Sequence, residues 1–307
     1  MGFWGHLPQQ LVNGLVLGSV YALLALGYSM VYGILRVLNF AHGDVFMVCS
    51  FAGWAALTAL LKSRIAAYPA VTLLLVLAVA MGVGVALGMA IERFAYRPLR
   101  KATRLAPLIS AIGVSIFLQN VVMLATGGRA KVYPLTSVIP SGLYLKVGTI
   151  TVSSTGLLVI GVSIILTLGL NYVIRTTSLG RMMRATAEDI EAAGFMGIPI
   201  DYVIAFTFAL GSALAGAGGV LIGLYYTQID FSLGFSAGMK AFTAAVLGGI
   251  GNLEGAVLGG VVLGLAESMG TAFIAPVYKD AIAFAILIIC LILRPNGILG
   301  DDVPEKV

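Results

Sequence analysis

Few ionisable residues interrupt the apolar stretches of this 307-residue chain, and Glu267 is the clearest of them. It lies within the apolar run Ala256–Ile274. A carboxylate inside a membrane-spanning segment is costly unless it faces a polar interior or a partner group. Glu267 is therefore expected either in a transport pathway or a contact between helices, or close to a membrane interface.

Polar groups also gather at two interruptions of the apolar pattern, one in each half of the chain. Asn39–Asp44 separates two hydrophobic segments, and Gly248–Gly260 is a glycine-rich interruption later in the sequence. Paired interruptions of this kind indicate a transport pathway at broken helices. The alternative is that His42 and Asp44 only cap helices at a membrane interface.

The candidate pathway residues share a polar side chain in an apolar setting. They are Asn39, His42, Asp44, Gln119, Asn120 and Glu267. The amides Gln119 and Asn120 fall in one apolar run, where such groups commonly hydrogen-bond between helices. Lys240 and Lys279 have stems long enough to reach a membrane interface, which is where we expect their ammonium groups.

Catalysis is not predicted by any cluster of residues. The sequence offers no nucleophile–base pair, and its only two histidines, His6 and His42, make a catalytic metal site unexpected. It also has no Gly-x-x-x-x-Gly-Lys-Ser/Thr phosphate loop, so the chain is not expected to bind ATP itself. We expect a non-enzymatic subunit without a cofactor, and any ATP-driven step must borrow its motor from another chain.

The amino-acid composition indicates the environment in which these polar residues lie. Hydrophobic residues make up 60% of the chain and charged residues only 10%, whereas an average soluble domain is about one quarter charged. A globular core of this size cannot hide so much apolar surface, so a lipid bilayer is required. The apolar runs are continuous, which favours helices over a β-barrel. The 39 glycines suit close helix packing, as in Gly84-x-x-x-Gly88 and Gly219-x-x-x-Gly223.

A span needs about 20 largely apolar residues. By this measure we expect eight or nine crossings in one all-α, polytopic transmembrane domain over residues 1–307. The long segments are Gln10–Leu35, Tyr68–Ile91, Leu105–Thr126, Ser154–Ile174 and Tyr202–Thr227. The shorter segments, which include candidates for re-entrant helices, are Val45–Leu61, Ala237–Ile250, Ala256–Ile274 and Ala281–Leu293.

Lysine and arginine predict the orientation, because cytoplasmic loops retain an excess of both. The basic loops Glu92–Arg104 and Arg175–Pro199 are therefore predicted to be cytoplasmic, and the Thr-, Ser-, Pro- and Gly-rich loop Gly127–Ser153 periplasmic. The net charge of +5 has the same origin, so no nucleic-acid partner is expected. The tail Gly300–Val307 is then inside. The N-terminus is outside if nine crossings exist and inside if one segment is re-entrant.

The segment Gly180–Ile200 is the most informative cytoplasmic stretch. Basic residues open it, acidic and then small residues follow, and Pro199 ends it, a pattern that predicts a short polar helix. It is either a solvated loop or a helix that docks in a partner's groove through its small residues, with its carboxylates on basic groups there. The candidate coupling residues are Glu188, Asp189, Glu191, Ala192, Ala193, Gly194 and Gly197.

A resemblance to a known family rests on several stretches. Glu191–Gly194 (EAAG) resembles the EAA loop, or coupling helix, of ABC importer permeases, although Gly197–Pro199 follows sooner than that family's usual spacing. Together with four further stretches it is similar to the LivH-type permeases of branched-chain amino-acid ABC transporters. These are Asn39–Asp44 (NFAHGD), Leu108–Gly113 (LISAIG), Phe117–Asn120 (FLQN) and Met239–Gly251 (MKAFTAAVLGGIG). The similarity runs over nearly the whole chain, down to Arg294–Gly300 (RPNGILG).

The resemblance implies a permease subunit in the bacterial inner membrane, surrounded by lipid, that forms half of a translocation pore as a heterodimer with a related permease. It implies two cytoplasmic ATPase subunits that use ATP and Mg²⁺, and a periplasmic amino-acid-binding protein. Related permeases carry branched-chain and other amino acids, small amides and urea, so the substrate stays open within that range. The alternative function is an ion-coupled secondary amino-acid carrier that uses Glu267 as its coupling site and needs no ATPase.

Overall fold

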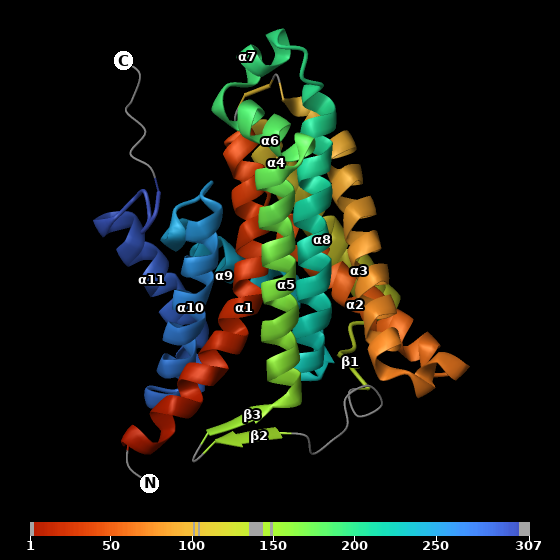
Figure 1. The fold of residues 1–307 in the computed structure, drawn as a ribbon, viewed down its shortest axis with the longest axis vertical. Helices are drawn as coiled ribbons and strands as arrows, with labels where there is room; N and C mark the ends of the chain where they lie inside the picture. Colours follow the sequence, from red (N-terminus) through yellow and green to blue (C-terminus); the bar gives the residue numbers. More distant parts are fainter. Residues whose placement is uncertain (1–2, 101, 104, 135–143, 148–149, 301–307) are drawn as a thin grey trace.

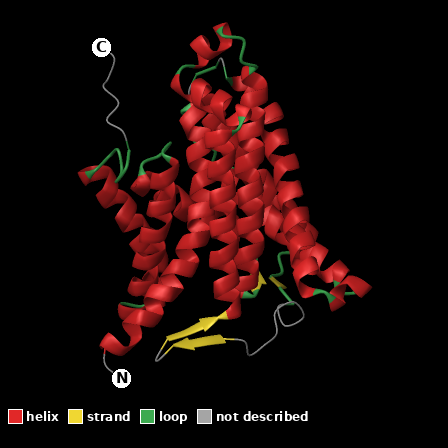
Figure 2. Cartoon of the chain, viewed as in Figure 1, coloured by secondary structure: helices red, strands yellow, loops and turns green. Residues whose placement is uncertain are grey.

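The computed structural model describes residues 3–100, 102–103, 105–134, 144–147 and 150–300, and helices dominate them (Figure 2). Most of the helices run side by side along the long axis of the molecule (Figure 1). Eight of the described helices are long and apolar enough to cross a membrane, and α9 (Leu233–Gly248) is a shorter apolar helix. The predicted all-α polytopic bundle of eight or nine crossings is thus confirmed.

The long helices follow the apolar runs of the sequence. They are α1 (Phe3–Leu35), α2 (His42–Leu60), α3 (Pro69–Ile91), α4 (Leu105–Thr126), α5 (Ser154–Thr176), α8 (Ile200–Tyr226), α10 (Leu253–Phe273) and α11 (Lys279–Leu293). Two short helices, α6 (Ser178–Glu188) and α7 (Ile190–Phe195), connect α5 to α8. Single turns lie at η1 (Arg64–Ala67), η2 (Glu92–Tyr96), η3 (Arg97–Leu99) and η5 (Pro276–Tyr278).

Four short strands lie at one end of the bundle and were not expected from the sequence. β2 (Tyr144–Val147) pairs antiparallel with β3 (Ile150–Ser153), and β1 (Lys131–Val132) pairs antiparallel with β4 (Gln228–Ile229). β2 and β3 lie at the end where α1 begins (Figure 1). The turn-rich composition of residues 127–153 concealed β1, β2 and β3, and the two residues of β4 follow α8 directly after Thr227. Strands of two to four residues leave almost no periodic pattern.

The centre of the bundle is formed by α1 and α8. In their most apolar windows 89% and 83% of the residues are buried, against 17% in α4 and 11% in the segment that ends with α11. A helix hidden on all sides must meet neighbours closely, and glycine allows this. A Cβ atom at Gly14 or Gly18 of α1 would lie 2.7 or 2.8 Å from a Cα atom of α10. The bundle therefore closes around α1 through backbone contacts.

The two predicted glycine pairs serve the same purpose. Gly84 and Gly88 on α3 lie against Ser212 of α8, and a Cβ atom at Gly219 on α8 would lie 2.5 Å from the Phe46 carbonyl oxygen of α2. Gly223 makes room for the ring of Tyr133. The expectation that these glycines permit close packing is confirmed.

Both predicted interruptions are real breaks in helices. α2 begins at His42, whose imidazole lies against Gly27, two turns before α1 ends at Leu35. The chain between α1 and α2 thus turns back toward the bundle before α2 starts. At the second interruption, Gly249 and Gly251 have positive φ and turn the chain sharply from α9 into α10. α9 also starts earlier than the predicted Ala237, because contacts of its first turn with the start of α2 support a helix that hydropathy alone does not indicate.

The two basic loops lie at one end of the molecule. Arg97 and Arg100 of the first loop contact Asp201 at the start of α8, directly after the second loop. The strands β2 and β3 lie at the opposite end (Figure 1). Two loops that are both predicted to be cytoplasmic must lie at the same end, as they do here, and which end faces the cytoplasm stays a prediction.

Sided labelling tests that prediction. Cys49 and Cys290 are both buried, so single cysteines introduced at Thr103 and Tyr144 can be labelled in a background that lacks the native thiols. We expect Thr103→Cys to react with a membrane-impermeant maleimide only from the cytoplasmic side and Tyr144→Cys only from outside. Labelling of both from the same side would contradict the orientation.

Candidate functional site

The start of α2 carries the first group of candidate residues. Asp44 is 1% exposed, and it accepts hydrogen bonds from Ser115 Oγ at 2.5 Å and from Gln119 Nε2 at 3.0 Å, both on α4. The N-cap residue of α2 is Ala41, and no side chain caps the helix there. Asp44 therefore joins two helices inside the bundle instead of capping a helix at its surface.

His42 and Asn39 lie close to this contact. The His42 ring meets the ring of Tyr28 edge-on, with centroids 4.9 Å apart, and its Nε2 atom has no hydrogen-bond partner among the described residues. The Asn39 Oδ1 atom accepts a hydrogen bond from the Tyr96 hydroxyl at 3.3 Å, which fixes the re-entering loop to η2. Asn120, by contrast, is exposed and donates to the Ile116 carbonyl of its own helix.

Glu267 belongs to a second and separate group. Its carboxylate is fully buried, and Tyr21 on α1 donates to both of its oxygens at 3.0 and 3.1 Å. Lys240 Nζ on α9 and Lys279 Nζ on α11 lie 3.3 and 3.0 Å from its Oε1 atom. The structure thus places Glu267 in a contact between helices.

Lys240 also lies 2.7 Å from Asp280 Oδ1, so two cations meet two anions here. We call Lys240, Glu267, Lys279 and Asp280 the ion cluster. The expectation that Lys240 extends to an interface is wrong. Lys240 is only 4% exposed, and its ammonium group pairs with Glu267 of α10 and Asp280 of α11. The sequence shows these residues only as isolated charges, since the packing of three helices brings them together. Their mutual pairing lowers the cost of burying them.

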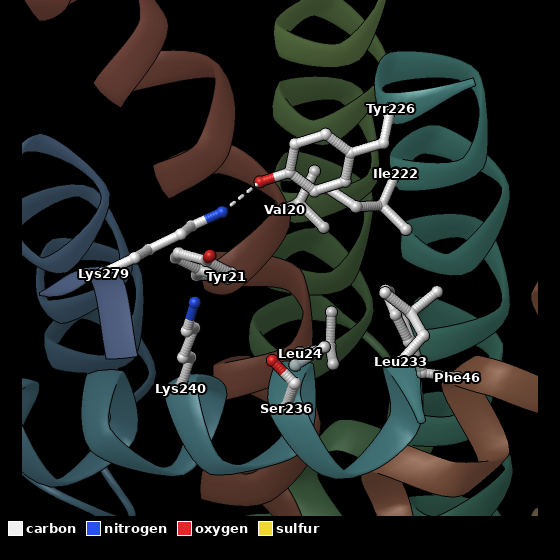
Figure 3. A pocket seen from close by; sticks show the side chains of 11 residues that line it. Val20, Tyr21, Leu24, Phe46, Ile222, Tyr226, Leu233, Ser236, Lys240 and Lys279 are labelled. Carbon is white, nitrogen blue, oxygen red and sulfur yellow. Dashed lines mark hydrogen bonds between the residues drawn. The ribbon is translucent and has the colours of Figure 1, made fainter. Parts of the chain in front are cut away.

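A cavity borders the ion cluster. Its lining residues come from α1, α2, α8, α9 and α11. They are Val20, Tyr21, Leu24, Phe46, Ile222, Tyr226, Leu233, Ser236, Ala237, Lys240 and Lys279. Lys279 donates a 2.7 Å hydrogen bond to the Tyr226 hydroxyl across it (Figure 3). We call this the lysine cavity.

The other group of candidate residues lies at the opposite end, in α6 and α7. The Asp189 Oδ1 atom accepts hydrogen bonds from the backbone N–H groups of Glu191 and Ala192 at 2.9 and 3.0 Å, so it caps α7. Gly197 has φ +82° and ends α7, with the N–H of Ile198 bonded to the Ala193 carbonyl at 3.1 Å. This is the glycine-terminated motif that the sequence predicted.

Only part of this segment faces solvent. Ala193 is 4% exposed and packs inward, so it is not available to a partner. Glu188, Glu191, Ala192 and Gly194 are exposed. Phe195 and Met196, which were not singled out, are 90% and 83% exposed at the tip. Two large apolar residues within a polar loop were the signal that could have identified them.

Ion pairs fix this end of the molecule to the bundle. Arg100 pairs with the buried Glu92 and, at 2.6 Å, with Asp201 at the start of α8. Arg175 at the end of α5 pairs with Glu254 at the start of α10. The arginines that predicted orientation therefore also hold the helix ends together. Among the described residues, no group of three or more His, Cys, Asp or Glu side chains is placed to hold a metal ion.

The fold and these two sites define a multi-pass membrane protein with a polar interior and a structured cap at one end. The chain belongs to the family described as "branched-chain amino acid transport system / permease component", which matches residues 10–291. No solved structure matches the chain significantly.

Several relatives are similar over most of their length. The high-affinity branched-chain amino acid transport system permease protein BraD of Pseudomonas aeruginosa is 46% identical over 98% of both chains. The corresponding permease protein LivH of Escherichia coli is 45% identical over 97% of both. The autoinducer 2 import system permease protein LsrC of Yersinia enterocolitica is 25% identical, over 88% of this chain and 71% of its own.

The ion cluster makes a prediction about stability. Replacing Glu267 by Gln leaves two lysines with one exposed carboxylate, and removing one partner of a buried ion pair typically costs about 3–5 kcal/mol. We expect Glu267→Gln to lower the thermal unfolding midpoint of the detergent-purified protein markedly. The matched control is Glu254→Gln, whose pair with Arg175 is exposed and worth about 0–1 kcal/mol. Equal midpoints for the two variants would contradict a structural role for Glu267.

Proposed function

We propose that this chain is the membrane-spanning permease subunit of an ATP-driven ABC importer for branched-chain amino acids in a bacterial inner membrane. The observation that carries the proposal is the 46% identity to BraD over 98% of both chains. The fold supports it, because the described helices surround polar groups and carry a small helical cap at one end. The chain performs no chemistry itself and conducts its substrate.

The proposed partners follow from that role. A second, related permease completes the pore as a heterodimer, two cytoplasmic ATPase subunits bind and hydrolyse ATP with Mg²⁺, and a periplasmic binding protein delivers the amino acid. The exposed outer face of α4 leaves room for contacts beyond this chain. Asn120 points to that face, so a role for it in the pathway requires a neighbouring subunit there. The inward-facing pathway candidates are Asn39, His42, Asp44, Gln119 and Glu267.

The ion-coupled carrier is the weaker alternative. A coupling carboxylate must exchange its proton or cation during each cycle. Glu267 is instead fully buried, already paired with two lysine ammonium groups and one tyrosine hydroxyl, and it does not line the lysine cavity.

Energy supply distinguishes the two functions. We expect uptake of L-leucine by proteoliposomes that contain the full complex to require ATP and to persist when ionophores collapse the proton and sodium gradients. The physical reason is that the motor lies in the ATPase subunits and not in a membrane carboxylate. Uptake that stops on addition of ionophore, with ATP still supplied, would favour the ion-coupled carrier.

Coupling is proposed to pass through α6 and α7. The tip offers the apolar side chains of Phe195 and Met196 next to Glu191 and Gly194, a mixture that suits a partner's groove lined with apolar and basic groups. Closing of the ATPase pair would press on this tip, and α8 follows it directly in the chain.

The substitution Gly194→Trp tests this role. A Cβ atom at Gly194 meets only Ile200 Cγ1, at 3.9 Å, so the chain itself tolerates a side chain there. Overpacking a docked interface typically costs about 1–3 kcal/mol, which at the upper end is roughly a hundredfold in affinity. We expect the variant to insert normally but to lose co-purifying ATPase and substrate-stimulated ATP hydrolysis.

The matched control is Gly169→Trp, because Gly169 is exposed on α5 with no atom within 4 Å of its Cβ position. It adds the same side chain away from the cap and should keep both properties. Normal ATPase association and stimulation in Gly194→Trp would show that α7 is a solvated loop and not the coupling element.

A further inference from the structure

The lysine cavity has two chemically different sides. Lys279, Lys240 and Tyr21 gather on one side, and Leu233, Phe46 and Ile222 gather on the other (Figure 3). The apolar residues come from α2, α8 and α9, and the cations come from α9 and α11. An occupant that suits both sides carries a charged head and a short aliphatic tail.

The charged residues that line the polar side of the lysine cavity are the cations Lys240 and Lys279. Glu267 is fully buried and is not among the residues that line the cavity, whereas Lys240 and Lys279 are. Lys279 donates to the Tyr226 hydroxyl and pairs with Glu267, and Lys240 donates to Glu267 and pairs with Asp280. An ammonium group has three N–H donors, and a carboxylate is the group that accepts charge-assisted hydrogen bonds from two neighbouring ammonium groups.

The charge balance selects the type of carboxylate. Lys240 and Lys279 are matched by Glu267 and Asp280, so the ion cluster is neutral as it stands. A simple anion would leave one net negative charge in a site of low dielectric constant, which is costly. A zwitterion adds no net charge. The cluster therefore accommodates an amino acid better than an aliphatic acid of the same shape.

The position of the cavity also fits an entry site. Tyr226 is the last residue of α8, directly before β4, at the end of the bundle that carries the strands. This is the end predicted to face the periplasm, where a binding protein would release its amino acid.

We propose that the lysine cavity is a binding site for an aliphatic α-amino acid, with the substrate carboxylate on Lys279 and Lys240 and its side chain among Leu24, Phe46, Ile222 and Leu233. This assignment rests on the proposed transport function and adds to it the place where the permease itself contacts the substrate. Specificity at this point is for a zwitterion with an apolar tail.

Photolabelling of the assembled transporter tests the assignment directly. The probe is L-photo-leucine, a leucine analogue with a diazirine in its side chain, and its ATP-driven uptake into proteoliposomes is measured first. After irradiation, adducts that excess L-leucine prevents are expected in 20–24, 222–226 or 233–240. If uptake proceeds and no adduct that leucine prevents falls in these segments, the site is overturned. If ATP drives no uptake at all, the transport function fails, and the site fails with it.

Two pairs of variants provide a second measurement. Losing a charge-assisted hydrogen bond from Lys279→Gln should lower uptake about tenfold to a hundredfold, with Lys279→Arg retaining most of it, and the exposed Lys62→Gln as the control. Ser236→Leu fills the cavity from α9, and Ala285→Leu adds similar bulk on the exposed face of α11.

All variants are compared per unit of complex that elutes at the normal volume, and the yield of photo-adduct is measured alongside uptake. The site predicts that Lys279→Gln and Ser236→Leu lose adduct and uptake together while their controls keep both. Correctly assembled Ser236→Leu complex with undiminished adduct and uptake would overturn the site.

Discussion

Close backbone contact around α1 is the constraint on which the rest of this structure depends. Lipid tails are as apolar as leucine, so helices in a bilayer gain little from burying leucine against leucine and must gain from packing distance. At Gly14 and Gly18 the backbone of α10 comes so close to α1 that there is no room for a side chain on α1. Once α10 is held there, Glu267 faces Tyr21, and α9 and α11 can place their lysines on the same carboxylate.

Two buried carboxylates of the bundle are stabilised in different ways, Asp44 by neutral hydrogen-bond donors and Glu267 by charged lysines. Asp44 is held by neutral donors from α4, a hydroxyl and an amide, in the first turn of α2, where the helix dipole favours a negative charge. Glu267 is held by full charges from two helices. The first arrangement keeps a lone anion at a helix start, and the second keeps a neutral group of ions that a zwitterion can join without changing the total.

Sequence reasoning succeeded where a residue's setting is local. Apolar length located the helices, α4 to the residue, and glycine with Pro199 predicted the end of α7. It failed where the setting is made by distant segments. The sequence predicted that the Lys240 ammonium group extends to a membrane interface, whereas in the structure it pairs with one carboxylate of α10 and one of α11. Ala193 and Gly194 are both small residues and adjacent in sequence, yet Ala193 faces the bundle and Gly194 faces solvent. Successive residues of a helix with 3.6 residues per turn point in different directions, so the packing of the helix decides which of the two is buried.

α8 connects the two ends of the molecule as one continuous helix. This helix of 27 residues is about 40 Å long and begins just after the exposed tip of Phe195 and Met196. It ends at Tyr226, whose hydroxyl holds Lys279 beside the lysine cavity. Hydrogen bonds run along the axis of the helix, and its most apolar window is 83% buried against neighbouring helices. Under the proposed coupling through α6 and α7, a displacement of these helices would pass along a single continuous helix to the side chain that holds Lys279, without a relay of side chains between the two ends.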